Sequence, residues 1–228
     1  MSSDLDFALS LADDADELAL ARFRARDLRV ETKPDRTPVS EADRAVEERL
    51  RTRIAAERPG ERVLGEEFGA DEGDGDRWIV DPIDGTRNYT RGIPVWATLI
   101  ALEDRVAVVS APALGRRWWA TRDGGAFCNG DPIRVSGIDR IEEATLLFAL
   151  DRPVPARAFD AWHLRGFGDF WAHVLVAEGA AEIAVDAPGL KIWDSAAVAV
   201  IVTEAGGRFD GHISSNGVLH DEALELGS

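Results

Sequence analysis

The chain has 228 residues, 45% of them apolar, which is enough to build a full core without disulfides or a structural metal. Its 26 basic and 42 acidic side chains leave a formal charge of −16, which disfavours partners such as nucleic acid and anionic membranes. The single Cys128 excludes an internal disulfide and is typical of a reducing, cytoplasmic location. No signal peptide is expected, and no apolar run reaches the roughly 20 residues that span a bilayer.

Two helices are predicted in the first 60 residues. The first covers residues 4–26, with Asp4 as its candidate N-cap. The second opens at Ser40 with a hydroxyl cap, carries apolar residues at a spacing of four, and ends before Pro59.

Short apolar runs separated by turn-forming residues follow, a pattern typical of strands and hairpins. The runs are 63–64, 78–80, 95–102, 106–109 and 117–121. Downstream, the pattern predicts a helix over 169–178, a strand over 181–185 and a helix over 194–205. This order of elements indicates an α+β fold of layered helices and sheets.

The segment 81–86, Asp-Pro-Ile-Asp-Gly-Thr, follows one of these runs and carries two carboxylates three residues apart. Pro82 lacks a backbone N–H and keeps Asp81 extended, so we expect the strand to end at Asp81 and the chain to turn. Two carboxylates around a freed carbonyl suit a hard divalent cation. Gly85 permits close backbone approach and Thr86 adds a hydroxyl and an amide, which suits a phosphate. A plain Asp-Pro turn is the structural alternative.

Two further acids lie at the ends of predicted elements. Glu66 follows the run at 63–64, where a solvated loop acid is the alternative, and Asp194 opens the last predicted helix, where an N-cap is the alternative. If these acids converged with Asp81 and Asp84, they would repel one another strongly unless a cation neutralised them. Such a cluster is typical of a two-metal site.

Several other catalytic patterns are absent from the sequence. There is no glycine-rich phosphate loop, no dinucleotide fingerprint, no H-E-x-x-H and no EF-hand loop. The histidines lack zinc spacing, and His163 and His173 are expected to be ordinary helix-surface or core residues. Phosphatases that form an aspartyl phosphate place their two acids one residue closer together, so that mechanism is not indicated.

Three ordered motifs resemble those of the inositol monophosphatase family, whose members are magnesium-dependent, lithium-sensitive phosphatases. They are G-E-E at 65–67, W-I-V-D-P-I-D-G-T-R-N-Y at 78–89, and W-D-S-A-A at 193–197 followed by E-A-G-G at 204–207. The resemblance implies an α-β-α-β-α layered fold forming one unit over 1–228. Within it we expect a metal-binding N-terminal α+β half over about 1–135 and a C-terminal α/β half over about 136–228. It also implies a homodimer that hydrolyses a small phosphate monoester with two or three Mg²⁺ ions.

The same resemblance assigns roles to individual residues. The residues that correspond to metal ligands are Glu66, Asp81, Ile83 through its carbonyl, Asp84 and Asp194. Gly85 and Thr86 correspond to a phosphate cradle, and Asp43, at the end of an early segment that starts with Lys33, corresponds to an acid that bonds the threonine. Glu66 and the Thr86–Asp43 pair would activate water at one metal, and a second metal would stabilise the leaving group, without a phosphoenzyme.

Three other stretches, 91–102, 165–180 and 215–224, resemble phosphatases of histidinol phosphate of actinobacterial type. By the same resemblance, Asp186 and Asp194 correspond to acids that lie beside the substrate. An acid at position 186 suits a cationic amino alcohol, and an ordinary loop acid is the alternative for Asp186. We therefore expect hydrolysis of histidinol phosphate in histidine biosynthesis. Inositol-1-monophosphatase or a related sugar or nucleotide phosphatase is one alternative. A metal-binding protein without turnover is the alternative from another class.

Overall fold

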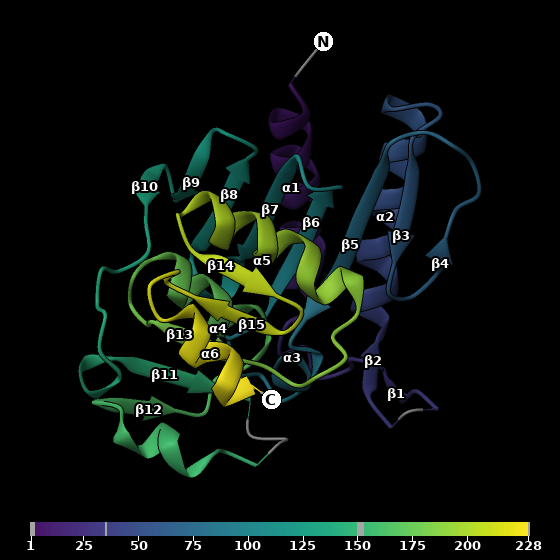
Figure 1. Cartoon of the computed structure of the whole chain (residues 1–228). Coiled ribbons are helices and arrows are strands. Elements are labelled where there is room, and N and C mark those ends of the chain that lie inside the picture. Colours follow the sequence, from purple (N-terminus) through teal and green to yellow (C-terminus); the bar gives the residue numbers. More distant parts are fainter. Residues whose placement is uncertain (1–2, 35, 150–152, 228) are drawn as a thin grey trace.

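The computed structural model describes residues 3–34, 36–149 and 153–227 (Figure 1). In these ranges the α-helices are α1 (Asp4–Arg22), α2 (Glu41–Glu57), α3 (Thr86–Thr90), α4 (Asp169–Ala177), α5 (Ile192–Glu204) and α6 (His220–Gly227). None of the helices in the described part of the chain is long and apolar enough to cross a bilayer.

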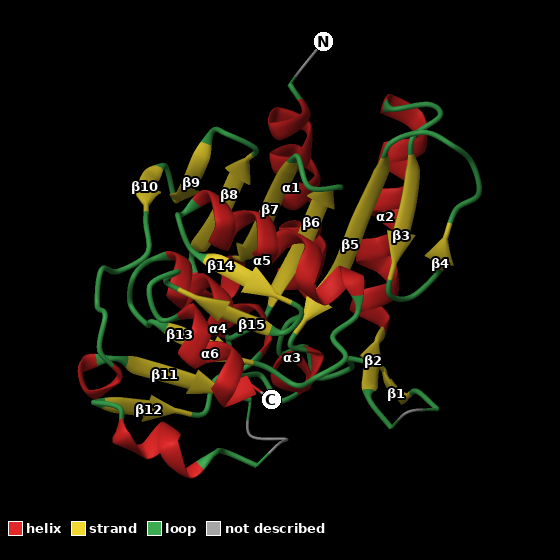
Figure 2. Ribbon diagram, in the orientation of Figure 1, coloured by secondary structure: helices red, strands yellow, loops and turns green. Residues whose placement is uncertain are grey.

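The larger sheet has the strand order β10-β9-β8-β7-β6-β5-β3-β4 (Figure 2). Its strands are β3 (Arg62–Gly65), β4 (Gly69–Ala70), β5 (Arg77–Asp84), β6 (Ala97–Leu102), β7 (Val106–Ala111), β8 (Arg116–Thr121), β9 (Gly125–Cys128) and β10 (Asp131–Ile133). Neighbouring strands pair antiparallel except β3 and β5, which run parallel, so the acids that follow β3 and those at the end of β5 emerge at the same edge of the sheet.

The smaller sheet has the order β12-β11-β13-β15-β14. Its strands are β11 (Thr145–Phe148), β12 (His163–Arg165), β13 (Ile183–Val185), β14 (Arg208–Asp210) and β15 (Ile213–Ser215). A two-stranded ribbon, β1 (Val30–Thr32) with β2 (Pro38–Ser40), leads into α2.

Five layers result from the way apolar faces are buried. Helices α1 and α2 pack on one face of the large sheet, around Leu11, Leu50 and Trp78. Helices α4 and α5 cover its other face through residues such as Phe170 and Ile201. The small sheet packs on α4 and is covered on its far side by α6. The order is therefore α-β-α-β-α, as expected. Along the chain, the strands of the large sheet come before residue 135 and those of the small sheet come after it. We propose that the predicted halves, about 1–135 and about 136–228, are structural units joined by α5.

Several predicted boundaries were wrong. Helix α1 ends at Arg22 because Phe23 turns extended and packs its ring on Tyr89 and Trp96, with centroids 5.4 Å away in each case. Its N-cap is Ser3, not Asp4, since the Ser3 hydroxyl accepts from the amide of the third helical residue at 3.1 Å.

The last predicted helix, α5, begins two residues earlier than expected. Asp194 is its third residue, and the Asp194 carboxylate accepts a hydrogen bond from the Lys191 amide at 2.7 Å. The N-cap alternative for Asp194 is therefore wrong, although its carboxylate does bind the start of the helix.

Candidate active site

Strand β5 continues past its expected end and carries both acids of the central motif. Its pairing with β6 is irregular between Asp81 and Asp84, where Pro82 cannot donate to the ladder. The Thr98 hydroxyl compensates by donating to the Pro82 carbonyl at 2.8 Å, and regular pairing resumes at Asp84. The irregularity leaves the side chains of Asp81 and Asp84 at 2% and 9% exposure, inside the protein rather than on an exposed turn.

Thr86, at the end of this motif, contacts Asp43, as the family resemblance implied. The Thr86 hydroxyl lies 3.2 Å from Asp43 Oδ1 and 2.9 Å from the Ile83 carbonyl oxygen. Ser40, the N-cap of α2, donates to Asp43 Oδ2 from its amide and its hydroxyl, at 2.8 and 2.6 Å. Burial raises the pKa of Asp43 despite these donors. Gly85 precedes Thr86 with φ +83°, and a Cβ there would lie 3.0 Å from the Val95 carbonyl oxygen.

Glu66 lies in the turn after β3 and is paired with a lysine. Lys33 Nζ donates to Glu66 Oε1 at 2.7 Å and to Glu67 Oε1 at 2.6 Å. Burial acts to lower the pKa of Lys33, but these two carboxylates raise it overall. Glu47 of α2, fully buried, accepts from the amides of Glu67 and Phe68 at 2.7 and 3.1 Å and so holds the turn.

Sequence reasoning did not identify Glu47. The signal was present, since Glu47 lies one turn after Asp43 on α2 and borders the buried stripe of Val46 and Leu50. An acid beside such a stripe must find donors when it is buried, and the turn amides after β3 supply them.

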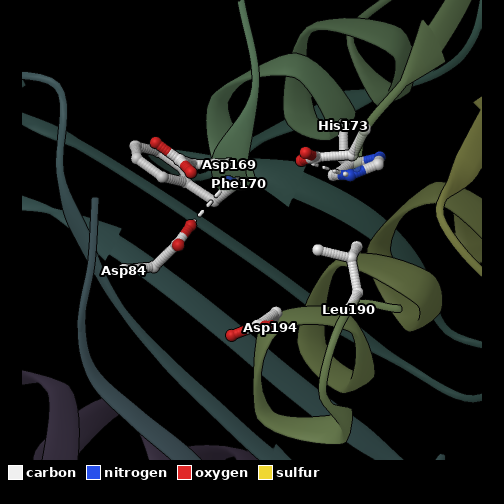
Figure 3. A pocket seen from close by; sticks show the side chains of 7 residues that line it. Asp84, Asp169, Phe170, His173, Leu190 and Asp194 are labelled. Atoms are coloured by element: carbon white, nitrogen blue, oxygen red, sulfur yellow. Dashed lines mark hydrogen bonds and ion pairs between the residues drawn. The ribbon is translucent and has the colours of Figure 1, made fainter. Parts of the chain in front are cut away.

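The first turn of α4 closes the other side of the site. The Phe170 amide donates to Asp84 Oδ2 at 2.5 Å, which joins the large sheet to a helix 86 residues away in sequence (Figure 3). Asp169 adopts φ +54°, a left-handed conformation uncommon for a residue other than glycine, and this strain is typical of functional sites. Nothing in the local sequence marks Asp169 or Phe170 as site residues.

A cavity of about 130 Å³ lies between α4 and α5. It is lined by Asp84, Asp169, Phe170, His173, Asp186, Leu190 and Asp194. Figure 3 shows Asp84 and Asp194 pointing toward this space, with His173 across it. Of the predicted site residues, this cavity brings together Asp84, Asp186 and Asp194. Asp81 and Ile83 are in β5 beside Asp84, Gly85 and Thr86 follow it, Thr86 contacts Asp43 of α2, and Glu66 follows β3, which pairs with β5.

The carboxylates interact electrostatically across these segments. Burial raises the pKa of Asp81 well above its usual value, and the charges of Glu66 and then Asp84 raise it further. Burial also raises the pKa of Asp84 strongly, with contributions from Asp169 and Asp194. The pKa of Asp194 rises to about 6, first through burial, and the charge of Glu66 adds to this rise. Glu66 and Asp194 therefore lie close enough to Asp81 for their charges to affect its ionisation.

In the described part of the chain, no three ligand-type side chains are arranged in a ready-made metal cage. Each candidate has another partner here: Lys33 for Glu66, the Thr86 hydroxyl for the Ile83 carbonyl, and a backbone amide for each of Asp81, Asp84 and Asp194. The donor set nevertheless fits a hard cation, because it consists of carboxylates and a carbonyl whose negative charge is unfavourable when buried without one. The predicted ligands therefore remain a prediction.

The histidines behave differently from one another. His163 lies in strand β12, not in a helix, and its ring is tilted against that of Trp162, with centroids 5.2 Å apart. His173 is a core residue, as expected, with 1% exposure, but it also lines the cavity beside Asp186.

Comparison with known proteins places the chain in a family. A model of the inositol monophosphatase family matches residues 1–212. The histidinol-phosphatase of Mycobacterium tuberculosis is 49% identical over 251 aligned residues, covering 97% of this chain and 96% of that protein. The histidinol-phosphatase of Streptomyces coelicolor is 45% identical, covering 97% and 95%.

Solved structures of related proteins have the same fold as this chain. An IMPase from Thermotoga maritima has a TM-score of 0.86 at 30% identity, with 97% of this chain and 95% of that chain covered. The extragenic suppressor protein suhB from Bartonella henselae has a TM-score of 0.87 at 27% identity, with 99% and 98% covered. The layered α+β fold expected from the sequence is confirmed. The chain belongs to the inositol monophosphatase family and is a phosphoric monoester hydrolase.

Proposed function

We propose that this hydrolase converts histidinol phosphate to histidinol and phosphate with the help of bound Mg²⁺. The observation that carries the proposal is that Asp186, Asp84 and Asp194 line the same cavity. The same cavity is lined by Asp84 and Asp194, acids suited to a cation, and by Asp186, a further buried acid suited to an amine. The two histidinol-phosphatases that this chain resembles over nearly their whole length support the same choice.

The metal would be held by the five predicted ligands: Glu66, Asp81, the carbonyl of Ile83, Asp84 and Asp194. Two or three Mg²⁺ ions fit the number of these donors. When bound, Mg²⁺ supplies charge neutralisation for the phosphate and lowers the pKa of coordinated water. Gly85 and Thr86 would bind the phosphate oxygens through their backbone N–H groups.

The Thr86–Asp43 pair moves the proton. The Thr86 hydroxyl lies 2.9 Å from the Ile83 carbonyl oxygen and 3.2 Å from Asp43 Oδ1; with the carbonyl engaged by a metal, it would direct its proton to Asp43 and accept a hydrogen bond from the attacking water. Ser40 fixes the other oxygen of Asp43, so the pair is oriented before substrate arrives. The water oxygen bonds to phosphorus and the ester P–O bond breaks, while the proton of the water passes through Thr86 to Asp43. The departing alkoxide takes a proton from solvent to become the alcohol, and Asp43 returns its proton to solvent. No bond forms between phosphorus and the protein.

Asp186 supplies the preference for a cationic alcohol. Burial opposes ionisation of Asp186, but its contacts with His173 and with the Ala187 amide outweigh burial, and the pKa of Asp186 lies below its usual value. A carboxylate that stays ionised in a narrow cavity attracts an ammonium group and gives no advantage to a neutral sugar. We place the reaction in the cytoplasm, in histidine biosynthesis, and in a homodimer, as the sequence resemblance suggested.

Release of inorganic phosphate tests the proposal. Histidinol phosphate, inositol 1-phosphate, adenosine 3',5'-bisphosphate and fructose 1,6-bisphosphate are each compared with Mg²⁺, with Mg²⁺ plus Li⁺, and with a chelator. We expect histidinol phosphate to be the best substrate, with activity lost on chelation and reduced by Li⁺. If inositol 1-phosphate is best, the alternative substrate class is correct. If Mg²⁺ raises thermal stability but no ester releases phosphate, the protein binds metal without turnover.

A further inference from the structure

His173 is the one histidine among the residues that line the cavity, and its ring is fixed on two sides. Its Nδ1 lies 2.6 Å from the Ser214 hydroxyl oxygen, and the Phe209 ring packs on it edge-on with centroids 5.5 Å apart. The third contact is with Asp186, whose Oδ2 lies 3.6 Å from His173 Nε2. These contacts come from β15, β14 and the segment after β13, so the small sheet sets the orientation of a residue on α4.

The order Ser214–His173–Asp186 has the composition of a nucleophilic triad, but its geometry excludes that role. Ser214 is fully buried, and it is not among the residues that line the cavity. An ester therefore has no access to its hydroxyl. The serine instead acts on the ring: because an ionised Asp186 can only accept, the favourable assignment puts the proton on Nε2 and lets Ser214 donate to Nδ1.

Asp186 itself is held at one oxygen and directed at the other. Its Oδ1 accepts from the Ala187 amide at 2.7 Å, the Asp169 amide also donates to this carboxylate, and Oδ2 faces His173. A contact of 3.6 Å is longer than a good hydrogen bond, so it guides the carboxylate without neutralising it. The carboxylate keeps its negative charge for a ligand in the cavity.

We propose that His173 is a positioning residue that holds Asp186 in the orientation that selects cationic phosphate esters over neutral ones. This inference rests on the proposed function, because it concerns the part of the same site that recognises the alcohol. It goes further by assigning the selection to a residue that does not itself contact the phosphate, held in place by the small sheet.

Two substitutions test separately the contacts made by the two ring nitrogens of His173. His173→Gln keeps an amide donor near the Nε2 position and so retains a partner for Asp186, whereas His173→Asn keeps a group near Nδ1 for Ser214 and leaves Asp186 without its guide. We measure kcat and KM for histidinol phosphate and for β-glycerophosphate, a neutral alcohol's ester. His220→Asn is the matched control, since His220 is also buried and its Nδ1 also bonds a serine of β15, Ser215, at 2.9 Å, but it does not line the cavity.

We expect His173→Asn to raise KM for histidinol phosphate by about 10-fold, the equivalent of a weakened hydrogen bond to a charged group. Its kcat, and both constants for β-glycerophosphate, should change little. His173→Gln should restore most of the lost preference, and His220→Asn should leave the ratio of kcat/KM values for the two esters unchanged. In an Asp186→Asn background, His173→Asn should cause no further loss, because both act through one contact.

An unchanged ratio in His173→Asn, or an equal loss on both esters, overturns the inference while the proposed function stands. If the unmodified enzyme releases no phosphate from histidinol phosphate, the proposed function and this inference fail together. Should both His173 variants fail to fold, Ser214→Ala is measured in their place. It keeps the ring but removes its anchor, and we expect the same selective rise in KM; a ratio equal to that of the unmodified enzyme would contradict the inference.

Discussion

The Phe170 amide donates to Asp84 Oδ2 at 2.5 Å and so ties the first turn of α4 to the end of β5. Asp84 is thereby fixed between the segment that carries the acids of the large sheet and the cavity lined by Asp186 and Asp194. In the proposed function, Asp84 would bind the cation while His173, on α4, would act on recognition of the alcohol, so Asp84 would link the chemistry to the selection of substrate.

Replacing Asp84 with Asn should abolish phosphate release. The amide keeps the size of the side chain but removes a negative ligand, so Mg²⁺ affinity should fall by at least the roughly 10- to 100-fold that accompanies loss of an indirect metal partner. Thermal stability without metal should not fall, because the change removes a buried charge whose ionisation is unfavourable. Calorimetric titration with Mg²⁺ and a phosphate assay measure these effects, and Asp160→Asn, at an exposed position, is the control. Retained turnover in Asp84→Asn would contradict the assignment.

Thr86→Ala should lower kcat by about 100-fold or more, since it removes the hydroxyl that orients the attacking water. KM should change less, because the backbone N–H groups that we assign to the phosphate remain. Thr86→Ser keeps the hydroxyl and should retain most of the activity. Steady-state kinetics on both variants check this, and equal activity of the alanine and serine variants would remove the hydroxyl from the mechanism.

Lys33→Met should destabilise the metal-free protein, because it leaves Glu66 and Glu67 close together without their shared cation. These groups are partly exposed, so the loss should be about 1–2 kcal/mol, less than the value for a fully buried pair. Added Mg²⁺ should recover part of it by neutralising Glu66. Denaturant unfolding with and without Mg²⁺ measures the effect. Arg44→Met, which breaks the more exposed pair with Glu31, is the control and should cost little.

The stabilising effect of Mg²⁺ should depend on pH. The pKa of Asp194 is raised to about 6 in the fold, and those of Asp81 and Asp84 are raised as well. The folded state therefore holds protons that the unfolded chain has already released, so Asp194 reduces stability as pH rises from about 4 through 6, and Asp81 and Asp84 act in the same direction. Mg²⁺ must displace those protons at low pH, whereas above about pH 6 it meets an ionised Asp194 carboxylate. The rise in Tm on adding Mg²⁺ should be larger at pH 7.5 than at pH 5, and Asp194→Asn should reduce that difference; a rise independent of pH would contradict this account.

Gly85→Ala should destabilise the protein more than Gly115→Ala. Both glycines have left-handed backbone, with φ +83° and +65°, so both substitutions carry the same kind of strain. Only at Gly85 would the new Cβ approach a backbone carbonyl, that of Val95, at 3.0 Å. We expect a loss of about 1 kcal/mol at Gly115 and roughly 2–3 kcal/mol at Gly85, measured by urea unfolding. Equal losses would show that the contact with Val95 is relieved by a small shift.

The sequence predicted the parts of the site that depend on short-range pattern. Asp81 and Asp84 follow an apolar run and flank a proline, so their place at the end of a buried strand could be predicted from neighbouring residues alone. Thr86 and Asp43 come from separate segments, and their contact was predicted only through the family resemblance. The strand's continuation through Pro82 could not be predicted, because it depends on a hydroxyl from Thr98 on the next strand.

Contacts between distant segments account for what the sequence did not predict. The pairing of Lys33 with Glu66 spans a ribbon, a helix and a strand, and no local pattern indicates it. Likewise, the sequence predicts His173 only as an ordinary residue of an apolar helix. In the fold, Asp186 and Ser214, from the small sheet and the segment after β13, lie beside its two ring nitrogens. The apolar residues around His173 in α4 favour its burial, but they do not indicate the cavity beside it.

Crystals soaked in Mn²⁺, with anomalous difference density collected near the manganese edge, test most directly whether the separated acids act as one divalent-metal site. We predict at least one strong peak bounded by Asp81, Asp84 and Asp194 or by Glu66 and the Ile83 carbonyl, and its loss in Asp84→Asn. The absence of any peak there, in protein that still hydrolyses phosphate esters after treatment with a chelator, would contradict the account.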